Sequence, residues 1–146
     1  MQKVLHFDSP AEAYRADACV VSCFDARFHP AMRKFLKRRG VLMADHIEIA
    51  GAAKWLASPE HEGDRDFVLR QIRTSMRRHG SERLILFLHT DCGAYDGQTD
   101  AALLWAELRK ARDFVRANEP GLSVECYLVD FEGVWQEAGL PVSGAA

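Results

Sequence analysis

The sequence lacks a long hydrophobic run. Its longest apolar stretches, such as Leu84 to Leu88, are far shorter than the roughly 18 residues of a membrane-spanning helix. The first eight residues also lack the basic and apolar blocks of a secretory signal peptide. These absences predict a soluble, cytoplasmic protein that has no membrane partner.

Neither sign of charge is in large excess. The chain has 19 Lys and Arg residues against 21 Asp and Glu residues, a formal net charge of -2, so no overall field attracts nucleic acid. One expected helix carries a basic stripe with acidic neighbours, which we interpret as a solvated face: Arg70, Arg73, Arg77 and Arg78. We therefore expect no nucleic-acid partner.

Cysteines are few, and the four present do not suggest a disulfide framework, because the chain has no export signal. Cys19 and Cys126 lie inside apolar runs, where free cysteine behaves as a small buried hydrophobe. Cys23 and Cys92 instead follow such runs, in polar segments. A thiol phosphatase or sulfurtransferase loop would need an Arg six residues after a cysteine, and none of the four has one. Cys23 and Cys92 are therefore candidates for metal binding.

The 146 residues, 48% hydrophobic and 27% charged, fit one domain with its own core, spanning 1–146. Apolar runs predict strands at 18–22, 42–49, 84–88 and 124–129. Helical periodicity and end signals predict helices at 30–39, 64–79 and 98–118. This alternation predicts an α/β fold, a mostly parallel sheet of four to five strands flanked by helices. We expect 133–146 to form an irregular tail.

Chemically active residues follow two of the predicted strands. Cys23 comes directly after the first strand, and His89 and Cys92 follow the strand at 84–88. Ligand sites form at the carboxyl ends of parallel strands, so these side chains are expected to converge. Two thiolates and one imidazole suit zinc, and three protein ligands leave a fourth position for water or substrate. The sequence therefore predicts a Zn2+ site made by Cys23, His89 and Cys92.

Asp25 and Arg27 lie two residues apart beside Cys23. A bend would place them side by side, as a charge-assisted pair in which Arg27 keeps the carboxylate ionised. Such a carboxylate could orient a metal-bound water, or it could coordinate the metal itself as the fourth ligand of a closed state. Both roles stay open at this point.

Cys-x-Asp-x-Arg at residues 23–27, followed by His-x-x-Cys-Gly at residues 89–93, resembles the signature of the β-class carbonic anhydrases. The resemblance extends over roughly residues 16 to 130. It implies that Cys23, His89 and Cys92 bind zinc, and that Asp25 and Arg27 form the catalytic dyad. It also implies a zinc lyase, a carbonate dehydratase that reversibly hydrates carbon dioxide to bicarbonate by a zinc-bound hydroxide.

The chain departs from this family after its second predicted strand. The family usually carries Arg-Asn-Ala-Gly there, whereas this chain has Glu48, Ile49, Ala50 and Gly51. An anion at Glu48 would repel bicarbonate if it lay near the metal. Two alternatives to carbon dioxide hydration follow: a non-catalytic zinc-binding member of the same fold, or a hydrolase of a related heterocumulene such as carbonyl sulfide or carbon disulfide.

Assembly is also expected. The apolar N-terminal arm, together with Trp55 and Leu56, would be hard for a monomer of this length to cover. The resemblance implies dimers or multiples of dimers. We therefore expect a homodimer or a larger homo-oligomer.

Overall fold

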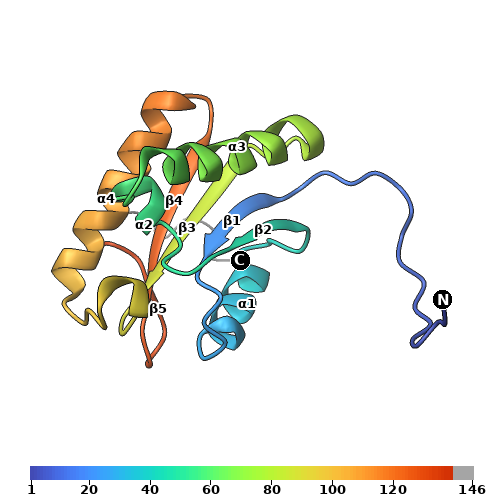
Figure 1. The fold of residues 1–146 in the computed structure, drawn as a ribbon, viewed down its shortest axis with the longest axis horizontal. Coiled ribbons are helices and arrows are strands. Elements are labelled where there is room, and N and C mark those ends of the chain that lie inside the picture. Colours follow the sequence, from blue (N-terminus) through green and yellow to red (C-terminus); the bar gives the residue numbers. More distant parts are fainter. Residues whose placement is uncertain (140–146) are drawn as a thin grey trace.

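Five short strands form one sheet in the computed structural model, which describes residues 1–139 (Figure 1). The strand order is β2-β1-β3-β4-β5. The first four strands are parallel, and the last is antiparallel to β4. The strands are β1 (Ala18–Ser22), β2 (Ala44–Glu48), β3 (Arg83–His89), β4 (Ser123–Val129) and β5 (Val134–Trp135).

The helices are α1 (His29–Arg38), α2 (Lys54–Ala57), α3 (Glu62–His79) and α4 (Ala101–Asn118), with one 3-10 turn, η1 (Gly93–Tyr95). α1 begins with a proline in its first turn, where a missing N–H costs nothing. At the end of α3, Gly80 adopts the left-handed conformation that favours glycine, with φ of 61°. The Asp100 side chain caps α4 by accepting a hydrogen bond from the backbone N–H of Ala102.

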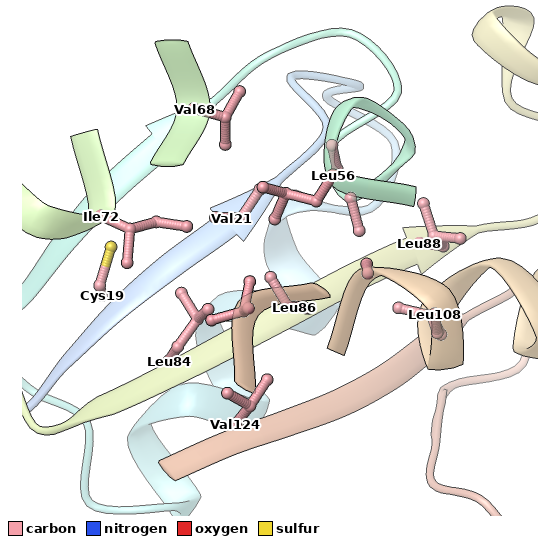
Figure 2. Packing of buried hydrophobic residues seen from close by; sticks show 14 of the residues in the cluster. Cys19, Val21, Leu56, Val68, Ile72, Leu84, Leu86, Leu88, Leu108 and Val124 are labelled. Carbon is pink, nitrogen blue, oxygen red and sulfur yellow. The ribbon is translucent and has the colours of Figure 1, made fainter. Parts of the chain in front are cut away.

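Helices cover both faces of the sheet (Figure 1). α1 packs on one face, where its buried Met32 and Leu36 meet residues such as Phe87. α2, α3 and α4 pack on the other face, where apolar side chains from strands and helices point toward one another (Figure 2). Each fully buried aliphatic side chain contributes about 1.5–3 kcal/mol of hydrophobic stabilisation, so this two-sided core holds the strand ends in place. The main members on the second face are Val21, Leu56, Ile72, Leu84, Leu86, Leu88, Leu108 and Val124.

The predicted α/β class and mostly parallel sheet are confirmed. The expectation of an irregular tail from residue 133 is wrong at its start, because Val134 and Trp135 pair with the end of β4. Residues 140–146 of that tail lie outside the described residues. The four-residue helix α2 was not predicted. No helix among residues 1–139 is long and apolar enough to cross a membrane.

The N-terminal arm, residues 1–15, extends away from the body of the molecule (Figure 1). Its root is fixed by Tyr14, whose hydroxyl donates to Asp45 at 2.5 Å and whose ring lies 4.1 Å from that of His79. Beyond this anchor Val4, Leu5 and Phe7 are 95%, 78% and 78% exposed. The arm therefore carries uncovered apolar side chains, as expected.

Trp55 and Leu56, unlike the arm, pack within the body of the protein. Leu56 is fully buried under the sheet, and Trp55 is half-buried with its indole N–H donating to the Ala50 carbonyl at 2.6 Å. The expectation that Leu56 needs a partner chain is wrong, because α2 places it in the core of the monomer, and Trp55 packs against that core.

Candidate metal centre

The pairing of β1 with β3 brings the predicted ligands together. Cys23 follows β1, His89 ends β3, and Cys92 lies three residues further on. One ligand atom from each lies within 4.8 Å of the others, and all three residues are buried. Among the described residues, Cys23, His89 and Cys92 form the group of side chains that could hold a metal ion.

The His89 ring is held in one orientation. Its Nδ1 lies 2.8 Å from the backbone carbonyl oxygen of Thr90, to which it can donate, and the ring of Phe28 packs against it at 4.5 Å. Its Nε2 is buried and has no hydrogen-bond partner among residues 1–139. Buried polar atoms are normally satisfied, and a ligating histidine typically donates its other ring N–H to a carbonyl or carboxylate. Nε2 therefore has the setting of a metal-binding nitrogen.

The two thiols differ in acidity. A hydrogen bond from the Cys92 thiol is the main cause that lowers the pKa of Cys23 to about 4, with help from His89 and from backbone N–H groups. The same interaction raises the pKa of Cys92. Burial works against a charged His89, but the neighbouring Cys23 thiolate outweighs it and raises the pKa of the imidazole. A thiolate is thus already favoured at Cys23, and thiolate together with imidazole is the donor chemistry that zinc prefers.

The loop after β2 closes over the sulfur atoms. The backbone of Gly51 hydrogen-bonds to both Cys23 and Cys92, lowering the pKa of each thiol. Gly51 adopts a positive φ of 84°, and a Cβ placed there would lie 2.8 Å from the Cβ of Ala94. Only glycine therefore allows this close approach. The sequence alone marked Gly51 as shared with the family but did not show this contact.

Asp25 and Arg27 form the expected pair. Arg27 Nε lies 3.0 Å and 3.1 Å from the two carboxylate oxygens of Asp25, and its NH2 group lies 2.7 Å from Oδ2. The hydrogen bonds from Arg27 are the main cause that lowers the pKa of Asp25 to about 2. Asp25 is therefore an ionised acceptor beside the Cys-His-Cys group, held by a two-point contact.

Two further contacts of Arg27 were not predicted. Its NH1 group donates to Oδ2 of Asp91 at 3.0 Å, and its guanidinium lies 5.5 Å from the ring centre of Phe131. Asp91 stands out in the sequence as an acid inside the His-x-x-Cys motif, but its contact with Arg27 does not follow from the motif. Phe131 gave no signal, because it is more than 100 positions from Arg27 in the sequence.

Glu48, which departs from the family pattern, faces His29. Its carboxylate lies 3.9 Å from Nε2 of His29, on the face of the sheet that α1 covers, and is about half exposed. Ile49 turns to the other face and, with Trp55 and Phe67, lines an apolar hollow of about 270 Å³. No ion pair links Glu48 to Arg27 or His89 within the described part of the chain.

The remaining cysteines are packing residues, as expected. Cys19 is fully buried in β1, and burial raises the pKa of its thiol to about 12. Cys126 lies in β4, where its Sγ is 3.6 Å from the carbonyl oxygen of Leu108 and burial again raises the thiol pKa to about 12. Neither thiol is near ionisation at neutral pH, so neither competes with Cys23 and Cys92 as a ligand.

A parallel sheet that carries a buried Cys-His-Cys group and an adjacent Asp-Arg pair defines a protein of the β-carbonic anhydrase type. Comparison with protein families matches residues 14–138 to the family described as "Putative carbonic anhydrase". The chain belongs to this family. It is also 26% identical over 133 residues to an uncharacterized protein of Rickettsia conorii, covering 84% of this chain and 72% of that protein.

Solved structures agree on the fold. A β-carbonic anhydrase of Trichomonas vaginalis superposes with a TM-score of 0.61 at 16% identity, covering 90% of this chain and 87% of that one. The carbonic anhydrase of Streptococcus mutans gives 0.57 at 18% identity, covering 85% and 82%. One of two tetrameric β-carbonic anhydrases of Sordaria macrospora gives 0.51 at 14% identity, covering 86% and 82%.

Proposed function

We propose that the protein is a zinc-dependent carbonate dehydratase that reversibly hydrates carbon dioxide to bicarbonate. The observation that carries this proposal is the placing of an ionised Asp25, held by Arg27, beside three ligand atoms that lie within 4.8 Å of one another. Family membership supports the same reaction class.

Each residue has a distinct task in this reaction. Zinc, when bound by Cys23, His89 and Cys92, lowers the pKa of water toward about 7 and so supplies a nucleophile at neutral pH. Asp25 accepts a hydrogen bond from the attacking water and orients its lone pair toward carbon dioxide. Arg27 keeps Asp25 charged and in place. Because the pKa of Asp25 is only about 2, it is no base, and the proton released with bicarbonate passes to solvent or buffer.

The chief alternative is a zinc protein without activity. Asp25 is the nearest carboxylate in sequence to the ligand Cys23, and once released from Arg27 it would fill the fourth position. The two-point contact with Arg27 opposes this closure, which favours the open, catalytic arrangement. A second alternative, hydrolysis of carbonyl sulfide or carbon disulfide, uses the same attack on an electrophilic carbon and the same residues.

We also propose that the chain assembles as a homodimer or larger homo-oligomer through its N-terminal arm. The arm exposes Leu5 and Phe7 while Tyr14 fixes its root to the body of the protein. A rigidly rooted segment with uncovered apolar side chains suits a contact with a second copy. The named tetrameric relative in Sordaria macrospora supports assembly in this fold.

The deciding experiment is stopped-flow hydration of carbon dioxide by metal-quantified protein from pH 6.5 to 9. We expect zinc-dependent turnover that increases with pH. No acceleration over buffer by zinc-loaded protein at pH 8.5 would overturn the enzymatic proposal. Parallel assays with carbonyl sulfide and carbon disulfide distinguish the heterocumulene hydrolase from the inert zinc protein.

A further inference from the structure

Arg27 uses every nitrogen of its guanidinium, and only some of these contacts go to Asp25. NH1 donates to Oδ2 of Asp91 at 3.0 Å, and NH2 also donates to the backbone carbonyl of Asp91 at 3.3 Å. The guanidinium carbon also lies over two aromatic rings, 5.4 Å from the centre of Phe28 and 5.5 Å from the centre of Phe131. Arg27 therefore bridges two carboxylates while aromatic rings restrict its remaining motion.

We propose that Asp91 and Phe131 are positioning residues that hold Arg27 in the orientation that presents Asp25 to the metal centre. We call the contacts of Asp91 and Phe131 with Arg27 the clamp. This inference rests on the proposed function for its catalytic meaning, although the clamp itself can be tested without activity. It assigns roles to an acid between two metal ligands and to an aromatic ring on the turn after β4.

The backbone of Asp91 explains how its side chain is aimed. Asp91 has a positive φ of 58°, a conformation that few residues other than Gly, Asn and Asp adopt readily. Its N–H donates to the carbonyl of Gln98 at 2.8 Å, which pins this conformation. The carboxylate is thereby directed back across the site to Arg27, 64 positions earlier in the chain. The positive φ of Asp91 is an unfavourable backbone conformation that directs its carboxylate toward Arg27, an orientation that packing alone does not require.

Hydrogen bonds within its own turn place Phe131. Oδ1 of Asp130 accepts hydrogen bonds from the N–H groups of Glu132 and Gly133, which fixes the turn between β4 and β5. The Phe131 ring then lies 5.2 Å from that of Phe28 and against Arg27, although 68% of the residue is exposed. Burial does not account for this position, whereas the contacts of the ring with Arg27 and Phe28 do.

The clamp separates the motions of the two dyad partners. Asp25 forms an ion pair with Arg27, whereas Arg27 also forms one with Asp91. If Asp25 leaves Arg27, the guanidinium keeps its contacts with Asp91 and Phe131 and stays where it was. Asp25 then returns to the same hydrogen-bonding geometry, so Asp91 and Phe131 determine how reliably the open arrangement is restored.

The test measures Arg27 directly in the full-length protein. Nitrogen-15 NMR of the Nε–H and NH2 groups reports rotation of the guanidinium, which contacts at all its nitrogens should slow. Asp91→Gly removes the carboxylate while suiting the positive φ. We expect rotation to become about two- to fivefold faster, the change that corresponds to losing a half-exposed ion pair. Asp91→Asn, which keeps a neutral acceptor, should restore part of the slow rotation.

Asp96→Gly is the matched control, because Asp96 lies in the same loop with a φ of 53° and makes no hydrogen bond to Arg27. It should leave the Arg27 signals unchanged. Equal effects of Asp91→Gly and Asp96→Gly would overturn the role of Asp91, because loop flexibility alone would then explain both. Unchanged Arg27 rotation in Asp91→Gly would do the same.

Phe131→Leu provides an independent test of the second contact. Loss of the ring should abolish its ring-current shift of the Arg27 Nε–H and speed rotation by about two- to fivefold, as for an exposed cation–π pair. Phe67→Leu, which alters an exposed aromatic residue on α3, should change neither. No change in Phe131→Leu would remove Phe131 from the proposal.

Activity then separates the clamp from the reaction. In zinc-loaded Asp91→Gly and Phe131→Leu, kcat for carbon dioxide should fall while zinc content and KM stay near the wild-type values. If the wild-type protein hydrates no carbon dioxide yet both variants free Arg27, the clamp stands and the proposed function fails. If the variants free Arg27 but keep the full kcat of an active wild type, the positioning role is wrong.

Discussion

Gly51 and Ala94 approach so closely that a Cβ on Gly51 would lie 2.8 Å from the Cβ of Ala94. Gly51 belongs to the loop after β2, and Ala94 belongs to η1, which begins directly after the predicted ligand Cys92. The contact therefore locks together two loops that approach the thiols from different strands. It also lets the Gly51 backbone reach both sulfur atoms.

Gly51→Ala should therefore destabilise the fold and weaken metal binding. A left-handed alanine costs about 1 kcal/mol, and overpacking against Ala94 adds about 1–3 kcal/mol. Gly40→Ala is a matched control, because Gly40 has a φ of 72° but no atom within 4 Å of its added Cβ. Urea unfolding and zinc content measure both effects. Equal losses in the two variants would contradict a role for the Ala94 contact.

Cys92→Ser should lose most of the bound zinc, since the hydroxyl is a poor replacement for a soft thiolate. Cys126→Ser, which changes a packing thiol of β4, should retain about one zinc per chain. Mass spectrometry of metal content after dialysis gives the comparison. Full zinc occupancy in a Cys23→Ser, Cys92→Ser double variant would show that the metal binds elsewhere.

Arg27→Ala should lower turnover more than it lowers zinc content, because Arg27 hydrogen-bonds to Asp25 and Asp91 and not to Cys23, His89 or Cys92. Asp25→Asn should keep zinc and lose the ability to close the site.

In the wild type, carbon dioxide hydration should rise roughly between pH 7 and 8.5, since two thiolates push the pKa of zinc-bound water to about 7 or above. A pH-independent rate in the wild type, measured by stopped flow, would argue against this ionisation.

Glu125 should make stability depend on pH. Burial alone would raise the pKa of this carboxyl, but hydrogen bonds from Arg83 and Tyr127 outweigh burial and lower it. A lowered folded-state pKa gives stability that is complete above the unfolded value of about 4.3 and is lost as pH falls through the folded value. Glu125→Gln should therefore cost about 1–3 kcal/mol at pH 7 and progressively less below pH 4.

Urea unfolding at pH 7, 5 and 3.5 measures this difference. Glu132→Gln, which alters an exposed glutamate beyond β4, should match the wild type at every pH. A constant penalty for Glu125→Gln across the range would mean that the charge of Glu125 is not what stabilises the fold.

A Leu5→Ser, Phe7→Ser double variant should shift the protein from oligomer to monomer, because it removes two large, exposed apolar side chains of the rooted arm. Light scattering at micromolar concentration measures the mass. Phe67→Ser, on the surface of α3, should leave the mass unchanged. A monomeric, zinc-loaded wild type would refute the assembly.

Patterns of local sequence were enough for the parts of the fold with strong periodicity. The continuous apolar run of β3 and the four-residue spacing of Val68 and Ile72 both predicted their burial correctly. Helix α2, with four residues, is too short to show a helical period. β5 has two residues and exists because Leu128 and Val129 offer an edge for pairing, which no local pattern reveals.

Local sequence patterns also predict only part of the site. The two motifs predicted that Cys23, His89 and Cys92 would converge, and the structure brings them together, although their role as ligands stays a prediction. Contacts that depend on the shape of loops were missed, including the reach of Phe131 to Arg27. The placement of Glu48 toward His29 was missed because the alternation of β2 does not say which face it presents to α1.

The pairing of β1 with β3 has a consequence for the order of folding. Cys23 and His89 are 66 positions apart, and only the finished sheet brings them within reach of one ion. Before the strands pair, the chain offers only the local His89 and Cys92, which bind metal weakly. Zinc should therefore leave the refolding rate almost unchanged and slow unfolding, as expected for a contact made after the transition state. The metal would bind after the sheet has formed and extend the lifetime of the native state.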